Sequence, residues 1–139
     1  MTSLNKAKEY LQKGYSICVY KDDEPLLSKG KGISFIAFLA RDKVDVRGAS
    51  VADKIVGSAA AHVYALLGVK EVYAEVLSVG GQQILAEANI SCSYGTLATE
   101  IINRQGTGLC PMEQAVLGIS DHSKALDAVL NKINELKSK

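Results

Sequence analysis

The sequence predicts an α/β fold with three layers, α-β-α, around a mixed and mostly parallel sheet that starts with an antiparallel hairpin. From about residue 44 onward, runs of β-forming residues alternate with helical patterns, which is typical of βαβ units and a parallel sheet. Near the N-terminus a charged turn at 21–24 separates two short strand-like runs, as in a hairpin. With 139 residues and no linker, residues 1–139 are expected to form a single domain.

Composition excludes several classes of function. Hydrophobic content of 47% and charged content of 22% are ordinary for a soluble globular protein. A net charge of +1 and the absence of Trp argue against a nucleic-acid partner. The apolar run 33–40 is too short to span a membrane, and residues 1–14 lack a signal-peptide pattern. We expect a cytoplasmic protein with no membrane partner.

The cysteines give no framework for disulfides or metal. Cys18, Cys92 and Cys110 are odd in number and widely spaced, so neither a disulfide set nor a zinc knuckle is expected. Small buried thiols in a reducing compartment are the preferred interpretation. No metal site and no cofactor are predicted.

An amphipathic helix and the hairpin begin the chain. Leu4, Ala7 and Leu11 recur at helical spacing, which places them on one apolar face. The run 15–20 is rich in β-formers and predicts a strand. Residues 25–28 are expected to be its partner, with proline at the first position, where a strand tolerates it.

A short helix and a third strand come next. Residues 33–40 predict a mostly buried helix. The alternation of Val44 and Val46 predicts the start of a strand that leads into residues 49–52.

A helix of small residues follows, and the rest of the chain repeats its strand-turn-helix pattern. Asp53 is expected to be its N-cap, and Gly68 is expected to end it in a left-handed conformation. Small residues at 57–61 would let this helix lie close to a neighbouring layer. The predicted buried stripe consists of Ile55, Val56, Ala59, Ala60, Val63, Leu66 and Leu67.

The later elements have similar signals. Residues 69–77 form the clearest strand, and Ser78 is expected to cap the helix after it. A short strand at 90–94 and a helix from Thr96 to about Asn103 are predicted next.

Two helices are predicted near the C-terminus. Pro111 and Glu113 stand at the first and third positions of a helix that starts after Cys110. A final amphipathic helix spans about Asp121 to Leu136.

Topology alone predicts where a ligand would bind, because ligands of parallel sheets lie at the carboxyl ends of the strands. There Asp53 could contact a ligand or act as a general base, and Lys54 could neutralise an anion. Ser78 with Gly80 and Gly81 could present free amides to a phosphate or carboxylate. The alternatives are helix capping for Asp53, an ordinary surface lysine, and glycines that only permit close packing.

The Gly-rich stretch 103–108 is a further candidate site. It could cover a ligand, with Arg104 reaching an anion and Asn103 and Thr107 beside it, or it could be a simple connector. It lacks the Gly-Lys-Ser/Thr ending of a P-loop.

Cys110, at a helix start, could be a nucleophile of lowered pKa, but it lacks an evident base. A buried inert thiol is the preferred interpretation. His62 is expected to be packed or half-exposed, and His122 to be solvated.

The layout of a hairpin followed by strand-helix-strand-helix-strand is similar to the cytidine deaminase-like fold. Within it, VADKIVGSAAA (51–61) and NRQGTGLCPME (103–113) resemble an uncharacterised prokaryotic family of unknown function placed in that superfamily. The resemblance covers about residues 4–117. Zinc deaminases need His or Cys with Glu at the first helix start and Pro-Cys-x-x-Cys at the next. Here those places hold residues 53–55 and 78–81, which lack the ligands.

The sequence therefore predicts a zinc-less deaminase-like domain that binds a small anionic or nucleotide-like ligand, without catalysis, at a crevice between Asp53 and Ser78. A metal-independent enzyme that uses Asp53, Lys54 or Cys110 is the first alternative. A homo-oligomeric assembly module is the second, because the resemblance implies homo-oligomers.

Overall fold

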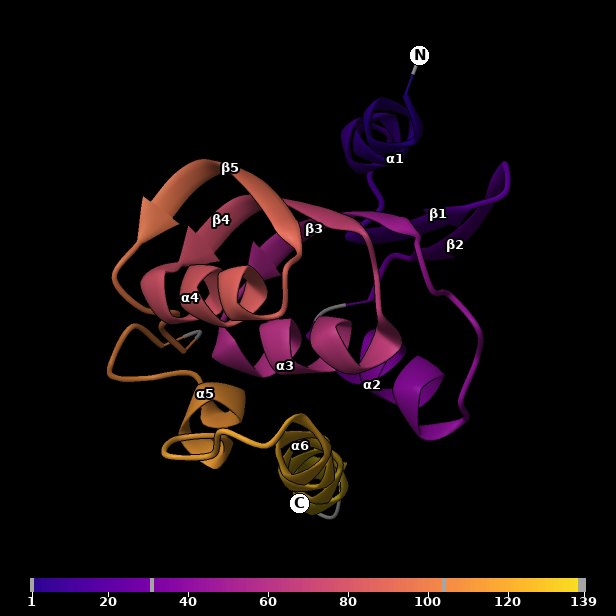
Figure 1. Ribbon diagram of the computed structural model, residues 1–139. Coiled ribbons are helices and arrows are strands. Elements are labelled where there is room, and N and C mark those ends of the chain that lie inside the picture. The colour runs from indigo at the N-terminus through magenta and orange to yellow at the C-terminus, as the bar shows by residue number, and fades with distance from the viewer. Residues whose placement is uncertain (1, 31, 104, 138–139) are drawn as a thin grey trace.

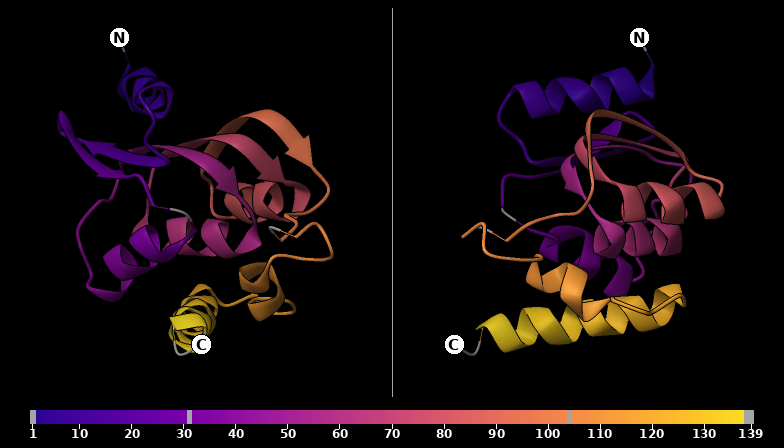
Figure 2. Two further views of the ribbon diagram at one scale, coloured as in Figure 1. Left: turned by 180° about the vertical axis from the view of Figure 1, so that it is seen from behind. Right: turned by 90° about the vertical axis from the view of Figure 1, so that its left-hand side faces the viewer.

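The structure is a computed structural model that describes residues 2–30, 32–103 and 105–137. It is a mixed α/β fold with one five-stranded sheet in the order β2-β1-β3-β4-β5 (Figure 1). The helix α1 lies on one face, α2, α3 and α4 lie on the other, and α5 and α6 pack outside α2 and α3 (Figure 2). In chain order the elements are α1 Ser3–Gln12, β1 Ile17–Lys21, β2 Glu24–Ser28, α2 Ser34–Arg41, β3 Ser50–Val56, α3 Ser58–Leu67, β4 Glu71–Ser78, α4 Val79–Glu87, β5 Ser91–Ala98, α5 Pro111–Ala115 and α6 His122–Lys137.

The first helix and the hairpin are confirmed. The Thr2 hydroxyl accepts a hydrogen bond from the Asn5 amide and caps α1, and Ala7 and Leu11 are buried against the sheet. Strands β1 and β2 pair antiparallel up to the pair formed by Lys21 and Glu24. The predicted helix at 33–40 corresponds to α2.

The third strand starts and ends later than predicted. Residues 44–46 lie outside any strand, and β3 continues through residue 56. Lys54, Ile55 and Val56 therefore extend the strand and do not open a helix, because pairing with β4 continues to Val56. α3 begins at Ser58, and Gly68 ends it in the left-handed region with a φ of 69°, as predicted. The predicted apolar stripe is wrong at Ile55 and Leu66, which are exposed.

The parallel half of the sheet consists of β3, β4 and β5, joined by α3 and α4. The final strand is longer than the predicted 90–94, and its pairing with β4 continues to residue 98. The predicted helix from Thr96 to Asn103 is therefore wrong. Thr96 lies in β5 opposite Val76, and this sheet pairing outweighs the weak local helical signal.

The main core fills the space between the sheet and the helices below it. Its largest fully buried side chains include Tyr64 of α3, Ile36 of α2, Leu85 of α4 and Val129 of α6. The predicted last helix is confirmed as α6, which packs on α2 and α3 (Figure 2). None of the helices in the described residues combines the length and apolar character that crossing a bilayer requires.

Two adjacent leucines of α3 provide a test of this packing. Leu67 is 6% exposed and Leu66 is 37% exposed. Leu67→Ala should lower the free energy of unfolding by about 2–4 kcal/mol, because it leaves a cavity in the core. Leu66→Ala should cost about 1 kcal/mol or less. Urea denaturation of both variants checks the difference, and equal losses would contradict this orientation of α3.

Candidate functional site

Asp53 is buried inside the sheet and does not cap a helix. It lies in β3 with only 5% of its surface exposed, and Gly57 occupies the N-cap position of α3. Its carboxylate accepts a hydrogen bond of 2.6 Å from the Tyr64 hydroxyl and one of 3.2 Å from the Ile55 amide. Burial raises the pKa of Asp53 to about 7, although the hydrogen bond from Tyr64 acts in the opposite direction. The predicted capping role of Asp53 is wrong because the strand continues past it.

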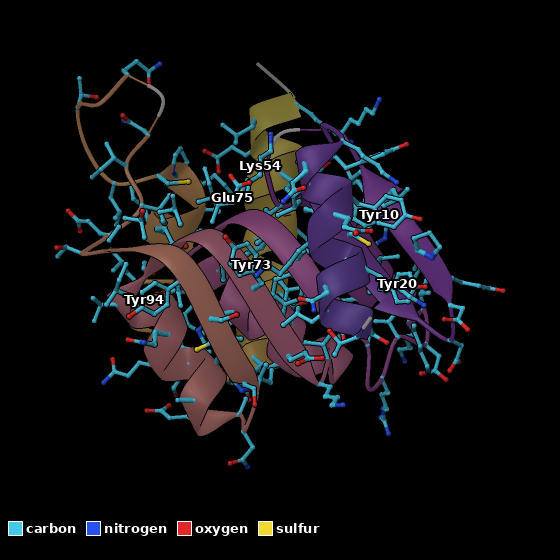
Figure 3. The ribbon with its side chains drawn as sticks, turned by 90° about the horizontal axis from the view of Figure 1, so that it is seen from above. Tyr10, Tyr20, Lys54, Tyr73, Glu75 and Tyr94 are labelled. Carbon is cyan, nitrogen blue, oxygen red and sulfur yellow. The ribbon has the colours of Figure 1, made fainter. Side chains whose placement is uncertain are left out.

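Lys54 is exposed and lies on the opposite face of the sheet. Successive strand residues point to opposite faces, and Figure 3, seen from the α1 side, shows Lys54 beside Glu75 and Tyr73. Asp53 and Lys54 therefore do not form a pair at one pocket. The predicted Asp53/Ser78 crevice is not observed as such, since the groove described below includes Ser78 but is not lined by Asp53.

Ser78 caps α4 as predicted. Its hydroxyl accepts a 2.9 Å hydrogen bond from the Gly81 amide. Gly80 and Gly81 face α3 at very short range: a Cβ at Gly80 would lie 2.5 Å from the Ser58 hydroxyl, and one at Gly81 would lie 3.0 Å from the Gly57 carbonyl. Close packing of α3 against α4 therefore accounts for both glycines.

The 103–108 loop is held by its own side chains. The Asn103 side chain accepts from the Thr107 amide at 3.0 Å and donates to the Thr107 hydroxyl at 3.1 Å. Arg104 lies outside the described residues. Cys110 is partly exposed at the N-cap position of α5, and Pro111 begins that helix as predicted.

Glu113 makes the central contact of this region. It is only 8% exposed, and its two carboxylate oxygens accept hydrogen bonds from the Ser58 amide at 2.7 Å and the Ala59 amide at 2.8 Å. A carboxylate on the first amides of a helix is stabilised by hydrogen bonding and by the helix dipole. A side chain at Gly57 would collide with the same carboxylate. Glu113 therefore caps α3 from a distant part of the chain.

Sequence reasoning missed this role. It placed Glu113 at the third position of its own helix, which is correct, but it could not assign the carboxylate to a different helix. A glycine directly before a helix that lacks a side-chain cap was the available signal, since such a helix needs an acceptor from elsewhere.

Two histidines join α3 to α6. His62 is buried, which agrees with the packed alternative of the prediction, and its Nδ1 lies 2.8 Å from Nδ1 of His122. Burial lowers the pKa of His62, and the charge of His122 lowers it further, while the Ile119 carbonyl acts in the opposite direction. In this contact one Nδ1 donates a proton and the other accepts it through its lone pair, so the accepting nitrogen carries no proton.

A groove of about 290 Å³ lies where these elements meet. It is bounded by the amino ends of α3 and α4, the segment after β5, α5 and the turn before α6. Polar and apolar side chains both contribute to its lining. Its lining comprises Ser58, His62, Ser78, Gly80, Gln83, Ile84, Thr99, Glu100, Leu109, Glu113, Val116, Leu117, Gly118 and Ile119. In residues 2–30, 32–103 and 105–137, no group of three or more His, Cys, Asp or Glu side chains is placed to hold a metal ion.

Comparison with known proteins identifies relatives of unknown function. The family model TM1506, described as a domain of unknown function (DUF1893), matches residues 6–133. The crystal structure of a DUF1893 family protein, TM1506 from Thermotoga maritima, is similar at 26% identity and a TM-score of 0.84, covering 95% of this chain and 91% of that one. No curated protein matches the chain.

The Glu113 contact can be tested by a double-mutant cycle. Glu113→Ala should lower the free energy of unfolding by about 1–3 kcal/mol, because two buried amides lose their acceptor. Gly57→Ala should cost a similar amount through collision with the carboxylate. In the double variant the collision is gone, so the two losses should sum to more than the measured loss. Chemical denaturation of the four proteins checks this, and strict additivity would contradict the contact.

Asp53 should make stability depend on pH. Its pKa rises from 3.8 to about 7 on folding, so the folded state binds the extra proton and stability is lost as pH rises from about 4 to 7. Asp53→Asn removes this loss and should gain at least about 1 kcal/mol relative to the parent between pH 4.5 and pH 8. His62 acts in the opposite sense: its pKa is lowered on folding, so stability is lost as the pH falls below the ordinary pKa of histidine. This loss is the same in the parent and in Asp53→Asn, so it does not affect their difference. Thermal unfolding across this range is the measurement, and parallel pH curves would refute the buried neutral carboxyl.

Proposed function

Because the chain belongs to the DUF1893 (TM1506) family of domains of unknown function, its fold assigns no activity, and we propose from the site itself that it binds a small polar molecule without catalysis. The groove at the amino ends of α3 and α4 is the binding site. The strand order, with a hairpin beside three parallel strands, supports a cytidine deaminase-like arrangement, in which ligands bind at this edge of the sheet.

The observation that carries the ligand class is the Glu113 carboxylate. It already occupies the amino end of α3, which is where an anion would otherwise be stabilised. The second charged side chain of the lining is also a carboxylate, Glu100. Phosphate or carboxylate groups would meet repulsion there. The sequence analysis expected an anionic or nucleotide-like ligand. We propose instead that the ligand carries no charge.

The remaining lining favours a nucleoside-like molecule. The hydroxyls of Ser58, Ser78 and Thr99 and the amide of Gln83 can exchange hydrogen bonds with a sugar or a base edge. The lining also contains apolar side chains, which suit contact with a flat ring. They are Ile84, Leu109, Val116, Leu117 and Ile119.

Two residues of α4 provide a matched test. Gln83 lines the groove, whereas its neighbour Gln82 does not. Adenosine and cytidine should raise the melting temperature by mass action, and both should bind more tightly than AMP, CMP or inorganic phosphate. Gln83→Ala should weaken nucleoside binding about fivefold through one lost hydrogen bond, and Gln82→Ala should leave it unchanged.

Isothermal titration and ¹H–¹⁵N chemical shifts measure these affinities and map the site. Tighter binding of AMP than of adenosine would overturn the uncharged assignment. Shifts confined to residues outside the groove, or the absence of nucleoside binding at millimolar concentration, would overturn the proposed function.

A further inference from the structure

The two edges of the sheet differ in how they are protected. The β2 edge has only five residues and carries Glu24 and Pro25, which are features that prevent an edge from pairing with another chain. The β5 edge has eight residues, Ser91–Ala98, with no charged side chain and no proline. Natural monomers rarely leave a long uncharged edge open.

The outer side of β5 has no partner in the described part of the chain. β5 is the last strand of the sheet and pairs with β4 alone, so every second residue directs its backbone N–H and C=O away from the sheet. Tyr94 is 42% exposed and Leu97 is 39% exposed. α1 covers the β1 and β3 side of the upper face and leaves β5 uncovered (Figure 3).

We propose that a second copy of this chain pairs with β5, antiparallel, and joins the two sheets into one. Identical strands related by a two-fold axis perpendicular to a sheet run antiparallel and satisfy each other's outward groups. The β5 side chains carry no charge, so the strand meets its own copy without repulsion. In such a dimer the β5 edges of both copies pair with each other, and the two β2 edges become the outer edges of the joined sheet.

This pairing also reaches the groove, although it stands independently of the proposed function. Thr99 and Glu100 line the groove and follow β5 directly. In an antiparallel pair the start of the second β5 lies beside the end of the first. The second copy therefore borders the side of the groove formed by Thr99 and Glu100.

Two leucines of nearly equal exposure on opposite edges allow a matched test. Leu97 of β5 is 39% exposed and Leu26 of β2 is 36% exposed. By light scattering the parent and Leu26→Lys should have twice the chain mass of 14.8 kDa, and Leu97→Lys should have the single mass, because lysine blocks edge pairing. A monomeric parent at 100 µM, or dissociation by Leu26→Lys instead, would overturn the proposal.

Hydrogen exchange of the parent protein gives a readout that does not depend on a folded variant. Alternate amides of β5 should be protected in the concentrated dimer and should exchange at least tenfold faster on dilution to monomer. A dimer whose outward β5 amides exchange at the monomer rate would show that the contact lies elsewhere and would refute the pairing.

Discussion

The contact between the Glu113 carboxylate and the first amides of α3 links the two halves of this structure. α3 lies at the centre of the core, and its amino end has no acceptor from its own neighbours, because Gly57 stands at the N-cap. The acceptor comes instead from α5, a helix of five residues that follows the 103–108 loop. The same contact demands a glycine at 57, so one interaction constrains two sequence segments that are far apart.

That contact also determines the character of the groove. A buried carboxylate at a helix amino end is well stabilised by two hydrogen bonds and the helix dipole, but it fills the place where an anionic ligand would gain most. Close packing of α3 and α4, through Gly80 and Gly81, brings the hydroxyls of Ser58 and Ser78 to the same groove. Part of the polar lining of the groove therefore comes from the helices that build the core.

Local signals predicted much of the fold. Helical spacing, the hairpin turn, the Ser78 cap and the left-handed Gly68 each depend on neighbouring residues, and each is found in the structure. The errors arose where distant pairing decides the outcome. β4 holds both residues 54–56 and residues 95–98 in strands, and no local pattern reports a partner strand.

The candidate site was predicted less well, for the same reason. Ser78 was placed correctly, since capping is local. Asp53 was predicted to be the N-cap of α3, but that position is Gly57, four residues later. The hydrogen bond from Tyr64 and the contact between His62 and His122 depend on which side chains meet after folding. A sequence pattern gives the residue types of such contacts but not their pairing.

The distance along the chain between α3 and its cap has a consequence for synthesis. During translation all five strands leave the ribosome before Glu113, which is 55 residues after Ser58. Until then the amides at the start of α3 lack this acceptor, and the sides of α2 and α3 that α6 later covers are open. All five strands of the sheet are therefore made before the residues that cap α3 and complete the core.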